Sequence, residues 1–96
     1  MLSNKNVAII KEYLLHRKKY QIGSKDVTEN IIQVLDKALI AKEAVSISVG
    51  KSKKLDLRRI ADQLQEKLNA TIVAIIGSTI ILYRFSSSLK THLISE

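Results

Sequence analysis

The stretch that decides the fold reads TIVAIIGSTIILYR and occupies residues 71–84. Its two halves, Thr71 to Ile76 and Thr79 to Arg84, are dense in β-branched residues, which favour strands. Between them stand Gly77 and Ser78, a Gly-X pair that suits a type II′ turn. The stretch therefore predicts an antiparallel hairpin, and this is the strongest local pairing signal in the chain.

Three amphipathic helices are predicted upstream of the hairpin, because apolar residues recur there at helical spacing. The first runs from Asn6 to about Arg17, the second carries Ile31, Leu35, Ala38 and Leu39, and the third carries Leu57, Ile60, Ala61, Leu64 and Leu68. Ser3 or Asn4 can cap the first helix, and Asp26 with Glu29 has the spacing of a capping box for the second. Asn69 tolerates a left-handed backbone and is the predicted stop of the third helix.

Two more strands are predicted between these helices. Tyr20 to Ile22 is short, and Val45 to Val49 alternates apolar and polar residues, which predicts one buried and one wetter face. A strand joined through a helix to the next strand normally makes a right-handed parallel crossover. The chain therefore predicts an α/β, two-layer sandwich in which three helices pack on a four-stranded mixed sheet. Residues 86–96 lose periodicity and are expected to form a frayed tail, with at most a helical turn around Leu89 to Ile94.

The charge balance points to a polyanionic partner. The 96 residues have ordinary globular composition, so the chain is expected to fold as one domain, yet 16 Lys and Arg against 9 Asp and Glu give a net charge of +7. Met1 to Lys25 hold six basic residues and one acid, and a second cluster comprises Lys51, Lys53, Lys54, Arg58 and Arg59. Two such clusters favour nucleic-acid binding. The alternative is a set of solvated faces that serve only solubility.

Several other classes of function are disfavoured. The chain has no cysteine, and His16 and His92 lack metal-ligand spacing, so no metal and no cofactor are expected. No activated nucleophile, acid-base pair or Gly-rich phosphate loop is visible, so an enzyme is not expected. The apolar runs are too short to cross a membrane and no signal peptide is recognised, which predicts a cytoplasmic protein without membrane contact.

Particular residues give the chain a family resemblance. They are Gln21-Ile22-Gly23, Thr28-Glu29-Asn30, the run from Ala70 through Ile76-Gly77-Ser78-Thr79, and Leu82-Tyr83-Arg84. In this order and spacing they resemble the CRM domain, named for chloroplast RNA splicing and ribosome maturation, and especially its bacterial single-domain, YhbY-like form. On this basis residues 1–85 are predicted to form the domain.

The resemblance implies a strand order of 1-2-4-3, a fold similar to the C-terminal domain of bacterial translation initiation factor three, and binding to structured RNA. It also implies association with precursors of the large ribosomal subunit. The family's loop after the first strand usually reads Gly-x-x-Gly and is likened to a phosphate clamp. Here Gly23-Ser24-Lys25-Asp26 keeps only the first glycine, although Lys25 supplies a positive charge.

The function expected from charge and resemblance together is that of a ribosome-assembly factor that contacts ribosomal RNA phosphates. The expected RNA-binding residues are Lys18, Lys19, Gly23, Ser24, Lys25, Lys53, Lys54, Arg58 and Arg84. A monomer is expected. The alternative function is a protein-protein adaptor whose positive charge serves only solubility.

Overall fold

The structure of the chain is a computed structural model that describes residues 2–22, 27–50 and 54–94, with side chains from residue 56 onward in the last range. The elements follow the predicted order of helix, strand, helix, strand, helix, strand, strand. They are α1 (Asn4–Leu15), β1 (Tyr20–Ile22), α2 (Glu29–Lys42), β2 (Ala44–Val49), α3 (Lys54–Leu68), β3 (Thr71–Ile76) and β4 (Thr79–Tyr83).

The four strands form one mixed sheet in the order β1-β2-β4-β3. β1 runs parallel to β2, and β4 runs antiparallel to both β2 and β3. Gly77 has a φ of 58° and Ser78 does not have a positive φ, as a type II′ turn requires. The predicted hairpin, the α/β class and the strand order are therefore confirmed.

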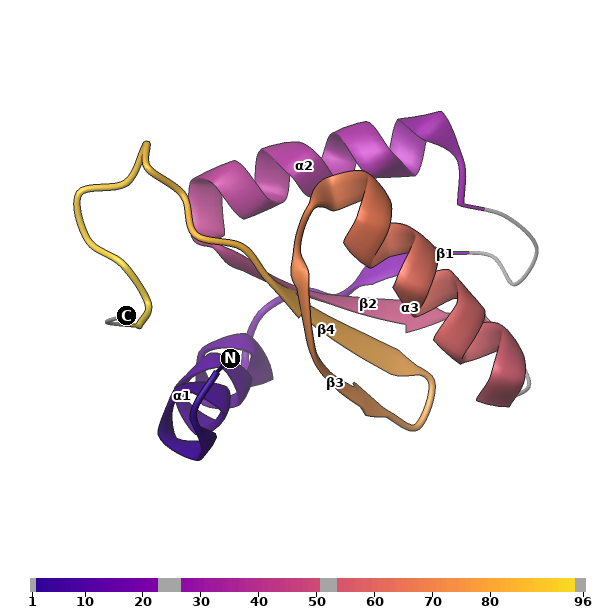
Figure 1. Cartoon of the computed structure of the whole chain (residues 1–96), viewed down its shortest axis with the longest axis horizontal. Coiled ribbons are helices and arrows are strands. Elements are labelled where there is room, and N and C mark those ends of the chain that lie inside the picture. Colours follow the sequence, from indigo (N-terminus) through magenta and orange to yellow (C-terminus); the bar gives the residue numbers. More distant parts are fainter. Residues whose placement is uncertain (1, 23–26, 51–53, 95–96) are drawn as a thin grey trace.

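The main core lies on the face of the sheet that α2 and α3 cover (Figure 1). Alternate residues of the central strands point into it, and they meet the apolar stripes of both helices. These residues are Leu35, Ala38 and Leu39 of α2, Leu57, Ile60, Ala61, Leu64 and Leu68 of α3, and Val45, Ile47, Val49, Ile80 and Leu82 of the sheet. Helical periodicity thus identified the packing faces of both helices.

The opposite face of the sheet carries a second, smaller core. Ile10 and Leu14 of α1 pack there with Ile81 of β4 and with Ile94 from the C-terminal segment. Figure 1 shows α1 on the far side of the sheet from α2 and α3. α1 and the C-terminal segment therefore add a partial third layer to the predicted sandwich of helices and sheet. For the same reason Ser46, expected on a wetter face, is buried.

The helix ends match the predicted caps in two cases out of three. The Ser3 hydroxyl accepts a hydrogen bond from Asn6 N (3.1 Å), and Asn69 has the expected left-handed φ of 52°. The cap of α2, however, is Thr28, whose hydroxyl accepts from Ile31 N (3.3 Å). Asp26, the predicted cap, lies outside the described residues, and Thr28, directly before Glu29, holds the cap position.

The C-terminal segment, residues 85–94, is not the frayed tail that its sequence predicts. The carboxylate of Glu43, which is 0% exposed, accepts hydrogen bonds from Ser86 N (2.8 Å) and Leu93 N (2.9 Å). It also bonds His92 Nδ1 at 2.6 Å. Glu43 follows α2 directly, as its C-cap, in a left-handed conformation with φ 67°. The buried carboxylate of Glu43 thus holds the C-terminal segment against the junction of α2 and β2.

Candidate nucleic-acid interface

β1 and β2 end side by side at one edge of the sheet, which we call the carboxyl edge. Ile22 pairs with Val49, and Gly50 N donates to Ile22 O at 2.9 Å. The β3–β4 turn lies there too, because Val49 N donates to Ser78 O at 2.9 Å. From this edge the chain leads into the N-terminal ends of α2 and α3, where backbone amides favour anions. The segments that follow β1 and β2, which contain both predicted phosphate-binding stretches, therefore leave the sheet at the same edge.

Several of the predicted RNA-binding residues fall outside the part of the chain that the structure describes. Gly23, Ser24, Lys25 and Lys53 belong to these, and Lys54 begins α3 with a side chain that is not described. Their roles stay predictions.

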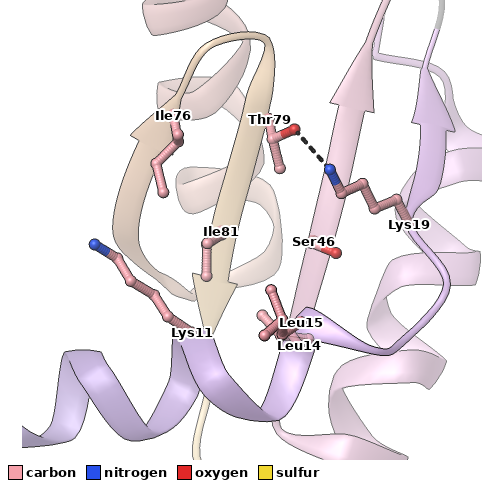
Figure 2. A pocket seen from close by; sticks show the side chains of 8 residues that line it. All are labelled: Lys11, Leu14, Leu15, Lys19, Ser46, Ile76, Thr79 and Ile81. Atoms are coloured by element: carbon pink, nitrogen blue, oxygen red, sulfur yellow. Dashed lines mark hydrogen bonds between the residues drawn. The ribbon is translucent and has the colours of Figure 1, made fainter.

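Lys18 and Lys19 are exposed in the linker between α1 and β1. The Lys19 side chain extends over the face of the sheet, and its Nζ donates to Thr79 Oγ1 at 3.5 Å (Figure 2). Because this hydrogen bond is long and exposed, an anion can compete for the ammonium group. Both lysines are therefore placed where a phosphate can reach them.

Arg58 and Arg59 lie on the exposed surface of the first turns of α3. Arg58 Nε is 3.2 Å from Asp62 Oδ1, and Arg59 NH2 is 3.6 Å from Asp56 Oδ1. Exposed pairs of this kind contribute about 0.2–1 kcal/mol, so a phosphate can displace the carboxylate. Arg58 remains available for RNA, with Asp62 as a competitor.

Arg84 has an internal role in the structure. Its guanidinium NH1 donates to Asp36 Oδ1 (2.8 Å) and to Leu68 O (2.7 Å), while NH2 donates to Asp36 O (3.1 Å). The side chain is 20% exposed and links β4 to α2 and to the end of α3. These bonds engage the group that was expected to meet phosphate. We therefore leave Arg84 out of the candidate interface.

A groove of about 410 Å³ opens on the α1 face of the sheet, and we call it the α1 groove. Figure 2 shows Lys11 and Lys19 on opposite sides of Ser46 and Ile81. Its lining consists of Lys11, Leu14 and Leu15 of α1, Lys19, Ser46 of β2, Ile76 of β3, and Thr79 and Ile81 of β4. The groove combines apolar walls with two cations, and no carboxylate is among these lining residues.

Sequence reasoning did not single out the α1 groove. Lys11 belongs to the N-terminal basic cluster, and Ser46 stands on the polar side of an alternating strand. The basic cluster and the alternation of the strand do not indicate that α1 crosses this face of the sheet and leaves part of it open. Residues from four elements meet here only because of the tertiary arrangement.

None of the helices is long and apolar enough to cross a membrane within the ranges described. In the same ranges, no cluster of three or more His, Asp or Glu side chains is arranged to hold a metal ion.

The fold and sequence are similar to those of known proteins. The sequence profile described as CRS1 / YhbY (CRM) domain matches residues 2–84. A Bacillus subtilis (strain 168) protein named probable RNA-binding protein YqeI is 32% identical over 71 residues, which cover 74% of each chain. The solution structure of the hypothetical protein SAV1595 from Staphylococcus aureus, a candidate RNA-binding protein, is similar with a TM-score of 0.75. The identity is 28%, and the match covers 91% of this chain and 92% of that one. The chain therefore belongs to the CRS1/YhbY (CRM) domain family.

Proposed function

We propose that this protein binds structured RNA through contacts between its lysines and arginines and the RNA phosphates. Family membership over residues 2–84 is the observation that carries the proposal, and the names of both relatives point the same way. The net charge of +7 supplies the electrostatic attraction.

The contacts we propose lie around the carboxyl edge and the linker before β1. Lys18, Lys19 and Arg58 are exposed there. Gly23, Ser24, Lys25, Lys53 and Lys54 are proposed to add to them from the segments that follow β1 and β2. Contacts of this type position an RNA backbone without reading its bases, which suits recognition of a folded RNA.

We further propose that the RNA is ribosomal RNA of the large-subunit precursor, and that the protein assists assembly by holding a segment of it. The family resemblance supports this choice. The protein would act in the cytoplasm as a monomeric binding protein, without catalysis and without a cofactor.

Phosphate contact makes a quantitative prediction. The logarithm of the affinity for a large-subunit ribosomal RNA fragment should fall linearly with the logarithm of salt concentration, by roughly 0.7–0.9 per contact. Filter binding at several salt concentrations measures this slope, and we expect several contacts. An affinity that is flat up to physiological salt would refute the electrostatic mechanism and favour the protein-protein adaptor.

A double charge-reversal variant and a matched control test where the phosphate contacts lie. Lys18→Glu with Lys19→Glu should weaken RNA binding at least tenfold and reduce the salt slope. The control is Lys37→Glu with Lys90→Glu, which changes the net charge equally at two exposed positions away from the carboxyl edge. Equal losses in both double variants would mean that only the overall charge matters.

The ribosomal part of the proposal has its own test. When a cell extract is sedimented on a sucrose gradient, the protein should appear in the fractions of large-subunit precursors. The Lys18→Glu, Lys19→Glu variant should move toward the top of the gradient. Wild-type protein that stays at the top, despite binding RNA in vitro, would contradict the ribosomal role alone.

A further inference from the structure

The α1 groove has features that phosphate contact does not use. Its walls are aliphatic, and its volume of about 410 Å³ lies within the range of about 300–1,000 Å³ that is typical of small-ligand sites. Ile76 on its wall is 53% exposed although it stands in a strand. An apolar surface of this kind, left open next to two lysines, is suited to a ligand with a flat apolar body and a negative charge.

Ser46 adds an independent observation. Its side chain lines the groove and is only 3% exposed, and its hydroxyl oxygen has no hydrogen-bond partner within the described part of the chain. A buried hydroxyl without a partner is unfavourable, so it is normally matched by some other group. A ligand that enters the groove can supply that group, and the hydroxyl can either donate to it or accept from it.

The groove also adjoins the carboxyl edge. Thr79 directly follows the turn whose Ser78 O accepts from Val49 N, and Ile76 directly precedes this turn. An RNA strand held at the edge by its phosphates would therefore pass the side of the groove that Ile76 and Thr79 line. The Nζ of Lys19, which donates to Thr79 Oγ1, lies on the same side.

We propose that the α1 groove takes one unpaired nucleotide of the bound RNA. The base would lie against Leu14, Ile76 and Ile81, its polar edge would bond Ser46 Oγ, and the adjoining phosphates would meet Lys11 and Lys19. Nucleobases combine flat apolar faces with hydrogen-bonding edges, and proteins commonly bind them unstacked between apolar side chains. This inference rests on the proposed RNA binding and adds the class of RNA: a helix that carries an unpaired nucleotide.

Two RNA probes test the proposal. One is a hairpin whose stem carries a single unpaired 2-aminopurine, and the other is the same hairpin with a fully paired stem. Stacking of one base on an aromatic side chain is worth about 5- to 150-fold in affinity. Because the walls are aliphatic and not aromatic, we expect the low end, a preference of about 5- to 20-fold for the first probe. Its fluorescence should rise on binding, as the base leaves its neighbours.

Two variants separate the groove from the phosphate contacts. Ile76→Glu places a carboxylate on the groove wall and should abolish both the preference and the fluorescence change. Its matched control is Val34→Glu, which makes the same change of charge at a 47% exposed residue of α2 on the other side of the sheet. The control should keep both signals. Ser46→Ala should reduce the preference severalfold without lowering the melting temperature, because it removes only an unbonded hydroxyl.

Each outcome decides the question. Equal affinity of the wild type for both hairpins, with no fluorescence change, would overturn the groove proposal and leave the phosphate contacts intact. Failure to bind either hairpin would overturn the proposed function together with this inference. An acidic peptide could instead shift the methyl NMR signals of Ile76 and Ile81 at a lower concentration than the first hairpin does. That result would overturn the proposal, because the groove would then prefer a protein ligand to RNA.

Discussion

Replacement of Glu43 by alanine is the most informative test of how the partial third layer is held. The Glu43 carboxylate is fully buried and accepts from two backbone amides and from His92. Alanine would leave the amides of Ser86 and Leu93 without an acceptor. Each buried donor left unsatisfied costs about 1–3 kcal/mol, so for two amides we expect a loss of about 2–6 kcal/mol.

This loss is a large fraction of the free energy of unfolding of a domain of this size, which is about 5–15 kcal/mol. At about 4–8 °C for each kcal/mol, the melting temperature of Glu43→Ala should fall by at least about 8 °C. Hydrogen exchange at Ser86 and Leu93 should accelerate more than in the main core. The control is Glu66→Ala on the exposed surface of α3, which should stay within about 0.5 kcal/mol of the wild type.

The same carboxylate also gives a pH dependence. Burial by itself raises the pKa of Glu43, but hydrogen bonds from Ser86, His92 and Leu93, with the charge of His92, bring it below the ordinary value of 4.5. A lowered pKa in the folded state stabilises the protein above pH 4.5, and this contribution is lost as the pH falls through the folded-state value. The difference in melting temperature between the wild type and Glu43→Gln should therefore shrink below about pH 4.5.

Two results would refute this reasoning. A Glu43→Ala protein that melts within about 2 °C of the wild type would mean that the carboxylate does not hold the C-terminal segment. The difference in melting temperature between the wild type and Glu43→Gln could instead grow as the pH falls below 4.5. This result would mean that folding raises the pKa of Glu43.

Two further substitutions test single contacts. Thr28→Ala removes the cap of α2 and should lower the free energy of unfolding, measured by urea titration, by about 0.5–2 kcal/mol. Thr28→Ser keeps an acceptor and should lower it less. Equal losses for both variants would show that the hydroxyl is not the cap. Arg84→Met removes the guanidinium that donates to Leu68 O and to the Asp36 carboxylate, and it should cost about 1–3 kcal/mol, with RNA affinity reduced only as expected for one lost charge. A tenfold loss of affinity in a folded Arg84→Met protein would return Arg84 to the interface.

The fold could be predicted from the sequence wherever a local pattern has only one structural solution. The Gly77-Ser78 pair between two β-branched runs specifies a hairpin, and the stripes on α2 and α3 specify which faces meet the sheet. Asn69 marks a helix end because few residues adopt its backbone conformation at low cost.

The parts that the sequence did not predict depend on distant contacts. Residues 86–96 look like a tail in the sequence, since the packing of residues 86–94 depends on Glu43, more than 40 residues earlier in the chain. The charge of Arg84 suggested phosphate, but Asp36 and the end of α3 surround its guanidinium. In the same way, Ser46 is a groove residue only because α1 crosses its face of the sheet, which no local pattern encodes.

The irregular pairing of β3 bears on the solubility of the protein. β3 is an edge strand, and its apolar, β-branched sequence is of the type that adds further strands and starts aggregation. Its register with β4 shifts between Ile72 and Ala74, which indicates a bulge, and Gln65 Oε1 accepts from Ile72 N at 3.1 Å. The bulge interrupts the regular ladder that another chain would extend, and the glutamine occupies one of its amides. The hairpin that decides the fold thus also carries its own protection against intermolecular strand pairing.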